Sequence, residues 1–73
     1  MGINVSLLKQ RLEKESISPD QLAKKIGIDR ATFYRKLKAG GVKFTVGEVL
    51  KMIDALNLSD ADAILIFFRE TVA

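Results

Sequence analysis

Two short helical segments separated by a turn of about three residues constrain this chain more than any other feature. The stretch SPDQLAKKIG has Ser18 in the capping position, Pro19 at the first helical position and Gln21 three residues after the serine. This pattern predicts a capping box that begins a helix. Gly27 favours the left-handed conformation that ends a helix, and Asp29 can cap the next one. A turn this short forces the two helices to cross at a steep angle.

The flanking segments also carry helical signals, and no strand pattern interrupts them. Asn4 can cap a helix from Val5 to about Lys14, and the helix that follows Asp29 runs to about Lys38. Ala39-Gly40-Gly41 closes that third helix.

Two further helices are expected in the second half of the chain. Thr45 with Glu48 repeats the capping-box pattern, and Ser59 with Asp62 opens a fifth helix that ends near Glu70. The apolar positions of the fourth helix that we expect to face inward are Val46, Val49, Leu50, Ile53 and Leu56. The sequence therefore predicts one all-α domain over residues 1–73, a compact arrangement of five helices.

Composition excludes most catalytic chemistry. The chain has no Cys and no His, so it lacks disulfides, a thiolate nucleophile, an imidazole base and the usual zinc ligands. The carboxylate pairs Glu13 with Glu15 and Asp60 with Asp62 are two residues apart, so on a helix their members point away from each other. We expect no enzyme activity, no catalytic residue, no metal, no cofactor and no small-molecule substrate.

The hydropathy pattern predicts no membrane-spanning segment and no membrane partner. The longest apolar run, Ala63 to Phe68, is far shorter than the roughly 20 residues that span a bilayer, and no secretion signal precedes the first helix. We expect a soluble cytoplasmic protein.

Charge is segregated along the chain. Residues 24–43 carry seven cations and a single carboxylate, Asp29, whereas residues 1–23 are balanced and residues 44–73 are net negative. Such segregation predicts one basic face, as expected of a protein whose partner is rich in phosphate. A basic but merely solvated surface is the alternative reading.

The third helix has one polar, cationic side and one apolar side. At about 100° per residue, five positions fall within about 140° of arc. These five are Arg30, Ala31, Tyr34, Arg35 and Lys38. Phe33 and Leu37 lie on the other side and would anchor the helix. A helix of this kind fits the major groove of B-DNA, where Arg can donate two hydrogen bonds to guanine and a small residue can meet a thymine methyl.

These residues resemble the Cro/repressor-type helix-turn-helix family, also called the XRE or lambda-repressor-like family. The resemblance rests on Leu22-Ala23, Gly27-Ile28, Thr32-Phe33 and Arg35, and the segment TVGEVLKMIDALNLS is similar to the fourth helix of that family. It covers roughly residues 3–70, and TFYRKLK looks most like phage and prophage regulators of Gram-positive bacteria. The resemblance implies a five-helix DNA-binding fold, a homodimer on a palindromic double-stranded DNA operator, and transcriptional control, most simply as a repressor.

The exposed face and the resemblance together give the candidate contacts, and a merely solvated charge is the alternative for Arg30 and Arg35. The base contacts are Arg30, Ala31, Tyr34 and Arg35, and the phosphate contacts are Ser18, Thr32, Lys36, Lys38 and Lys43. Pro19 stands where the family has a DNA-contacting Gln, so that contact is lost or moves to Ser18 or Asp20. Tyr34 can instead be a partly buried rim residue, Thr32 can instead cap its own helix, and Lys38 and Lys43 can be flexible surface lysines. Phe33, Leu22, Ala23 and Ile28 are expected in the core.

The last apolar run suggests a place for dimerisation. A helical wheel at about 100° per residue puts one apolar set toward the core, namely Ala61, Ile64, Leu65, Phe68 and Val72. Ala63, Ile66 and Phe67 then lie on another face, which two copies could bury around a twofold axis. In the alternative, Phe67 folds back over the first helix.

A rival function uses the same helices without DNA. An antirepressor or adaptor that binds proteins would show no salt-dependent binding to duplex DNA. Salt dependence therefore separates the two hypotheses.

Overall fold

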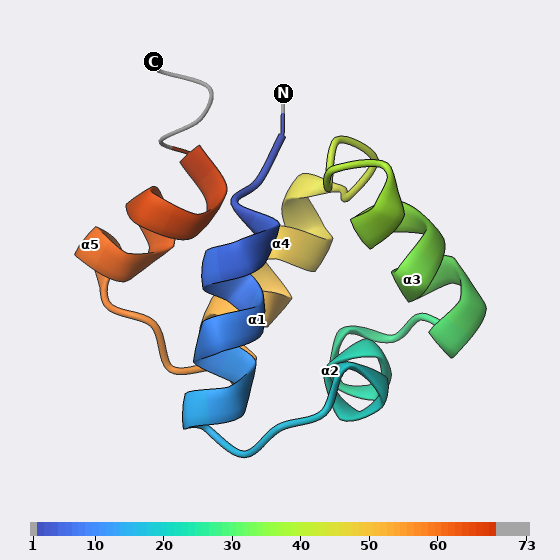
Figure 1. Cartoon of the computed structure of the whole chain (residues 1–73), viewed down its shortest axis with the longest axis horizontal. Coiled ribbons are helices and arrows are strands. Elements are labelled where there is room, and N and C mark those ends of the chain that lie inside the picture. Colours follow the sequence, from blue (N-terminus) through green and yellow to red (C-terminus); the bar gives the residue numbers. More distant parts are fainter. Residues whose placement is uncertain (1, 69–73) are drawn as a thin grey trace.

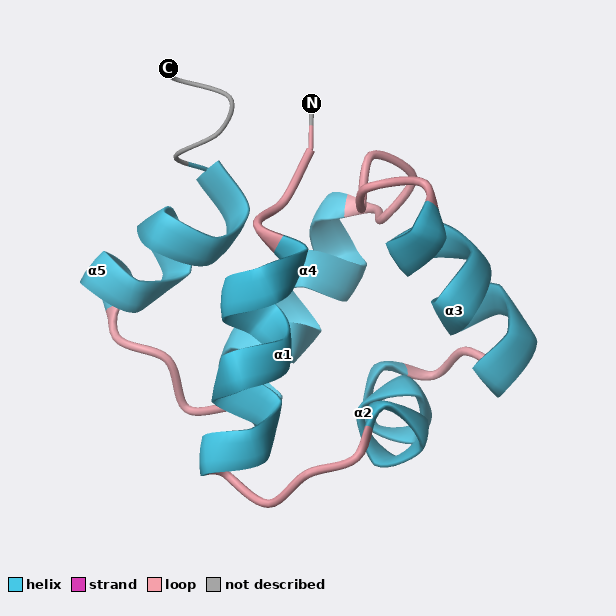
Figure 2. Ribbon diagram, viewed as in Figure 1, coloured by secondary structure: helices cyan, strands magenta, loops and turns pink. Residues whose placement is uncertain are grey.

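The computed structural model describes residues 2–68 and contains five α-helices followed by a π-helix (Figure 1). The elements are α1 (Val5–Lys14), α2 (Pro19–Ile26), α3 (Arg30–Lys38), α4 (Val46–Ala55), α5 (Asp60–Ala63) and the π-helix η1 (Ile64–Phe68). Loops join them, and Figure 2 shows no strand within the described residues. The predicted all-α, five-helix fold is confirmed. The expected end of the last helix near Glu70 lies outside the described residues.

Local hydrogen bonds begin and end the helices where the sequence predicted. Ser18 Oγ accepts from the Gln21 N–H at 3.1 Å while Gln21 Oε1 accepts from the Ser18 N–H at 2.8 Å. Thr45 and Glu48 make the same reciprocal pair at 3.0 and 2.9 Å. Gly27 ends α2 with a φ of 83°, a conformation that glycine adopts without steric cost.

The cap of α3 differs from the expectation. Asp29 precedes the helix in extended conformation, but its side chain makes no capping bond to the backbone. Its carboxylate instead accepts a hydrogen bond from the Thr32 hydroxyl. Asn4 and Ser59 do cap α1 and α5, accepting from the N–H groups of Leu7 and Asp62 at 3.0 and 3.1 Å.

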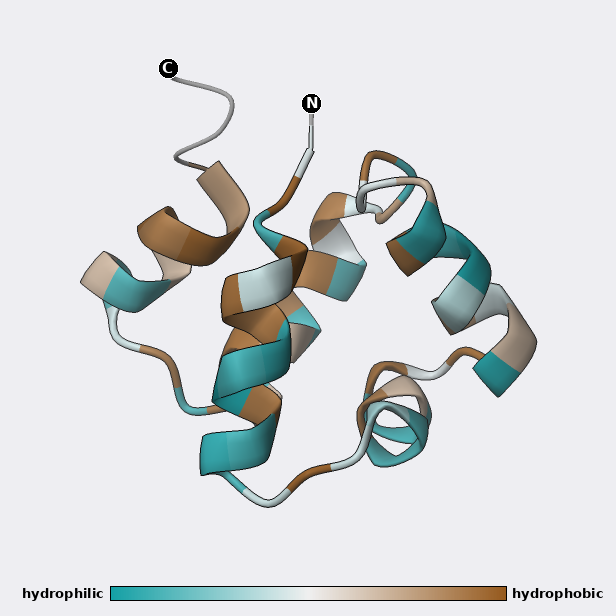
Figure 3. Cartoon of the chain, viewed as in Figure 1, coloured by the Kyte–Doolittle hydropathy of each residue, from teal (hydrophilic) through white to brown (hydrophobic). Residues whose placement is uncertain are grey.

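The core lies where α1, α2, α4 and η1 meet the apolar side of α3. Its largest fully buried side chains are Phe33, Phe67, Leu8, Leu22, Ile26, Met52 and Leu56. In Figure 3 the hydrophobic colours gather around α1, α4 and η1, whereas hydrophilic colours dominate the side of α3 in view. This core holds α3 by one side and leaves its other side to solvent.

The inward face predicted for α4 is partly wrong. Val46 and Leu50 are 73% and 59% exposed, and Met52, which was not among the predicted positions, is fully buried. The helix has more apolar positions than one contact can cover. Its contact with α2 buries the stripe centred on Val49 and leaves the flanking Val46 and Leu50 outside.

The faces predicted for the last helix are reversed. Ala63, Ile66 and Phe67 are buried at 6%, 4% and 1% exposure, so they belong to the core and the dimerisation assignment to these three residues is wrong. Ala61, Ile64, Leu65 and Phe68, which were expected to face the core, are exposed, and Val72 lies outside the described residues. Both sides of this segment are apolar, so packing against α1 decides which side is buried.

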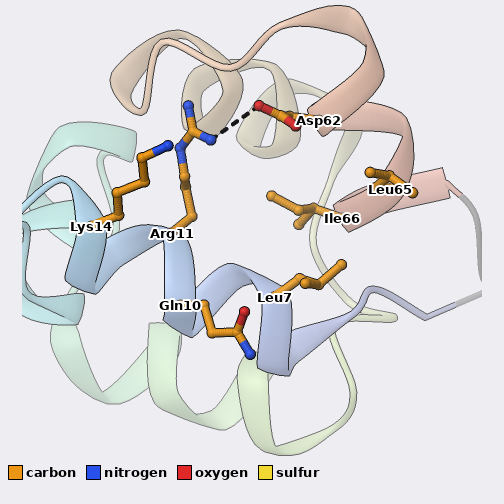
Figure 4. A pocket seen from close by; sticks show the side chains of 7 residues that line it. All are labelled: Leu7, Gln10, Arg11, Lys14, Asp62, Leu65 and Ile66. Atoms are coloured by element: carbon orange, nitrogen blue, oxygen red, sulfur yellow. Dashed lines mark hydrogen bonds and ion pairs between the residues drawn. The ribbon is translucent and has the colours of Figure 1, made fainter.

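An ion pair accompanies that packing. Arg11 Nη1 on α1 donates to Asp62 Oδ2 on α5 at 3.0 Å (Figure 4). Arg11 Nε also lies 3.5 Å from Glu15 Oε2. The pair closes one side of a hollow of about 290 Å³ whose walls come from α1, α5 and η1, including Leu7, Leu65 and Ile66. Figure 1 shows α5 on the opposite side of α1 from α3.

Candidate nucleic-acid interface

The link between α2 and α3 sets the orientation of the candidate recognition helix. After Gly27, the Ile28 N–H donates to the Ala23 carbonyl at 3.0 Å, which turns the chain sharply away from the end of α2. Phe33 is fully buried and Leu37 is 7% exposed, so both anchor α3 as predicted. The Phe33 ring also packs against the Phe44 ring, with centroids 5.6 Å apart. These contacts hold α3 along the side that faces the core.

The opposite side of α3 is open to solvent. Arg30, Ala31, Tyr34 and Arg35, the four predicted base contacts, are all exposed. Figure 1 shows α3 at the edge of the molecule, with α2 seen nearly end-on beside its first turn. The structure therefore brings these four side chains together on one accessible face.

Arg30 makes two local contacts on this face. Its Nε lies 3.3 Å from Asp20 Oδ1, and its guanidinium carbon lies 5.5 Å from the centre of the Tyr34 ring. The side chains of Arg30 and Asp20 are 72% and 50% exposed, so solvent screens the pair and it contributes little to stability. Arg30 can exchange this partner for a DNA group at small cost.

Thr32 is engaged within its own helix. Its hydroxyl donates to Asp29 and accepts a hydrogen bond from Arg35 Nη2 at 3.2 Å. The bond from Thr32 lowers the pKa of the Asp29 carboxyl below its ordinary value of 3.8. The arrangement favours the alternative in which Thr32 stabilises the start of α3, and it holds the Arg35 side chain near the outer face.

Lys36 is engaged by a partner on α4. Its Nζ donates to both carboxylate oxygens of Glu48, at 2.7 and 3.0 Å, and lies 5.7 Å from the centre of the Phe44 ring. The side chains of Lys36 and Glu48 are 18% and 13% exposed. Burial alone would raise the pKa of Glu48, but the hydrogen bonds from Lys36 and from the Thr45 N–H lower it below 4.5. A phosphate contact by Lys36 would require breaking this pair.

The other predicted phosphate contacts lie on the surface beside α3. Ser18 at the start of α2, Lys38 at the end of α3 and Lys43 in the loop beyond it are exposed. The Ser18 oxygen already accepts from the Gln21 N–H, yet its hydroxyl hydrogen can still be donated to another group.

Lys9 is a candidate that the sequence did not single out. It lines a hollow of about 300 Å³ between α1 and α3 together with Pro19, Tyr34 and Lys38. Sequence reasoning missed it because the charges of residues 1–23 balance and only the fold brings α1 beside α3. The pair Lys36 and Glu48 was also missed, because its members are twelve positions apart and only the fold brings them together.

The comparison with protein families identifies the domain that carries this basic surface. The model of the Cro/C1-type HTH DNA-binding domain matches residues 7–67, which run from α1 into η1. The chain belongs to the Cro/C1-type family. The predicted family is thereby confirmed. Comparisons with curated proteins and with solved structures gave no match.

The Cro/C1-type domain explains why one helix is anchored on one side and cationic on the other. Its family binds DNA, and the residues matched include all of α2, the turn and α3. Among residues 2–68, no three carboxylates or other metal ligands lie close enough to hold a metal ion. No helix described for the Cro/C1-type domain has the length and apolarity needed to cross a membrane.

Proposed function

We propose that the chain is a sequence-specific, double-stranded DNA-binding transcription regulator that inserts α3 into the major groove. The observation that carries this proposal is the two-sided character of α3: Phe33 and Leu37 are buried, and the cationic side is exposed. On that exposed side Arg30 and Arg35 can donate paired hydrogen bonds to guanine, Ala31 can meet a thymine methyl, and Tyr34 can contact a base or a phosphate.

Ser18, Lys38 and Lys43 are the phosphate contacts that we propose. All three are exposed: Lys38 and Lys43 lie at and beyond the end of α3, and Ser18 precedes Pro19, which lines a hollow with Tyr34 and Lys38. Contacts of this kind fix the register of a protein on the duplex without reading its sequence. Thr32 and Lys36 are better assigned to holding α3, because each is only partly exposed and already bonded. Thr32 bonds to Asp29 and Arg35 at the start of its own helix, and Lys36 bonds to Glu48 on α4.

The oligomeric state, the operator symmetry and the regulatory role are proposed from the resemblance. We propose a homodimer on a palindromic operator, acting as a phage or prophage repressor in the bacterial cytoplasm. The interface cannot be made by the buried Ala63, Ile66 and Phe67, but Ile64 and Leu65 of η1 are 52% and 37% exposed and could pair around a twofold axis. Leu65→Glu should then shift sedimentation from dimer to monomer without unfolding the chain, whereas a wild-type monomer at high micromolar concentration would contradict the dimer.

Selection of bound duplexes from a random pool tests the whole proposal. A recovered palindrome would support sequence-specific binding and twofold symmetry together, and a single recovered half-site would support binding by a monomer. No enrichment, with duplex binding indifferent to salt between about 50 and 200 mM, would contradict DNA binding by this surface and favour an antirepressor or adaptor that binds proteins.

A further inference from the structure

The segment Gly2–Asn4, which precedes α1, links two distant parts of the chain. The Ile3 N–H donates to the Gly40 carbonyl at 2.9 Å, and the Asn4 N–H donates to the Ile66 carbonyl at 2.7 Å. Figure 1 shows this segment passing between η1 and the loop that joins α3 to α4. Adjacent backbone groups therefore bind η1 on one side and the loop that follows α3 on the other.

The Ile3 side chain reinforces the contact with the loop. It is 8% exposed and belongs to the core, and Gly41 beside it is also buried. A Cβ atom added at Gly41 would overlap Cγ1 of Ile3 and come within 2.7 Å of its Cδ1. Gly41 also has a φ of 78°, which L side chains rarely adopt. The close approach between Ile3 and the loop thus requires glycine at position 41.

The same part of the loop is tied to the last turn of α3. The Gly40 N–H donates to the Leu37 carbonyl and the Gly41 N–H to the Lys36 carbonyl, both at 2.9 Å. Lys38 and Lys43, two of the proposed phosphate contacts, stand just before and just after these glycines. A loop whose backbone is already ordered loses less conformational entropy when its side chains bind a partner.

We propose that Ile3 is a positioning residue for DNA binding, because it holds the α3–α4 loop so that Lys43 meets a phosphate. The inference rests on the proposed function, since it takes Lys43 to be a DNA contact. Ile3 itself is buried and touches no DNA; it acts through the loop. Removing its side chain should free the loop, and Lys43 would then no longer add a defined contact.

A double-mutant comparison tests this role. Lys43→Ala is introduced into the wild type, into Ile3→Ala and into the control Leu58→Ala, which truncates a partly buried aliphatic residue in the α4–α5 loop, away from the proposed interface. Affinity for the selected duplex is measured against salt concentration at a temperature where circular dichroism shows every variant folded. Hydrogen exchange of the amides of residues 40–45 is measured in parallel without DNA.

The expected outcome separates position from stability. Lys43→Ala should reduce the slope of log affinity against log salt by about 0.9 in the wild type and in Leu58→Ala, and by much less in Ile3→Ala. Loop amides should exchange faster in Ile3→Ala than in Leu58→Ala. Equal slope changes in all three backgrounds, or loop exchange unchanged by Ile3→Ala, would overturn the role of Ile3.

Two further results remain decisive. If Lys43→Ala leaves the slope unchanged in the wild type, the assigned phosphate contact fails and the inference fails with it, whatever the loop exchange shows. If Ile3→Ala does not fold, Ile3→Val replaces it and Leu58→Val replaces the control. A smaller change in the same direction then supports the proposal, and loop exchange equal to that of the control refutes it.

Discussion

Lys36 Nζ on α3 lies 2.7 Å from Glu48 Oε1 on α4, and the same oxygen accepts from the Thr45 N–H at 2.9 Å. One carboxylate therefore completes the cap of α4 and holds α3 against it. The Lys36 ammonium also sits over the Phe44 ring, whose neighbour is the anchoring Phe33. The orientation of α3 thus depends on a largely buried ion pair between two helices that the loop of residues 39–45 separates.

Removing one partner of this pair should destabilise the fold. Glu48→Gln retains a residue that can complete the capping box but leaves the Lys36 ammonium without its counter-charge, so we expect a loss of about 1–3 kcal/mol in the free energy of unfolding. This expected loss of stability is smaller than for a fully buried pair, because both side chains keep some exposure to solvent. Urea denaturation measures it, with Lys36→Met and the double variant as controls. If the double variant loses the sum of the two single losses, the two residues are not coupled.

The same pair predicts a loss of stability in acid. The pKa of Glu48 is below its ordinary value of 4.5 in the folded chain, so its contribution is present above pH 4.5 and is lost as the pH falls through the folded pKa. The pKa of Asp29 is also lowered, from its ordinary value of 3.8, so its contribution to stability is likewise lost as the pH falls through the folded pKa. Urea midpoints measured from pH 6 down to about pH 3 should fall in the wild type and fall less in Glu48→Gln. Parallel curves for the two proteins would count against Glu48 as the titrating group.

Base contacts and phosphate contacts should respond differently to truncation. Arg30→Ala or Arg35→Ala should cost about 1–3 kcal/mol on the preferred duplex and relax the preference at particular base pairs. Lys38→Ala should weaken all duplexes alike and reduce the salt slope by about 0.9. Binding to a panel of single-substitution duplexes distinguishes the two outcomes. Lys51→Ala, which removes an exposed cation of α4, is the control and should leave the preference unchanged.

Lys9 should behave as an additional phosphate contact. It lies beside Tyr34 and Lys38 at the hollow between α1 and α3, so Lys9→Ala should reduce the salt slope of duplex binding by about 0.9 without changing base preference. Lys14→Ala is a matched control on the same helix, because Lys14 lines the separate hollow beside Arg11. Equal effects of the two substitutions would mean that overall charge, and not the position of Lys9, governs the slope.

Phe67 should act as a core residue. It is 1% exposed and its ring lies 6.4 Å from that of Phe68, so Phe67→Ala should reduce the free energy of unfolding by about 3–5 kcal/mol. Thermal denaturation followed by circular dichroism measures the loss. The neighbouring Leu65→Ala, on an exposed position, should change stability far less. If Phe67→Ala left stability intact and abolished dimerisation, the burial of this side chain within one chain would be contradicted.

The positions where helices begin and end could be predicted from the sequence. Ser18 with Gln21, Thr45 with Glu48, and Gly27 form bonds or backbone conformations that depend on residues a few positions apart. The side of α3 that faces the core was predictable as well. Phe33 and Leu37 form its apolar side, opposite the cationic side, so no other side could be buried. Together these local signals predicted the fold class and predicted that the four candidate base contacts face solvent.

Tertiary structure alone decided the choices between two apolar faces and between distant partners. On α4 and on α5 with η1, apolar residues occur on more than one side, and only packing against α2 and α1 selected Met52 and Phe67 for the core. Lys36, which was expected to contact phosphate, pairs instead with Glu48. Lys9 lies beside α3 because the fold places helices that are separated in sequence next to each other. Helix caps depend on hydrogen bonds within a few residues, whereas burial and ion pairing depend on where whole helices pack.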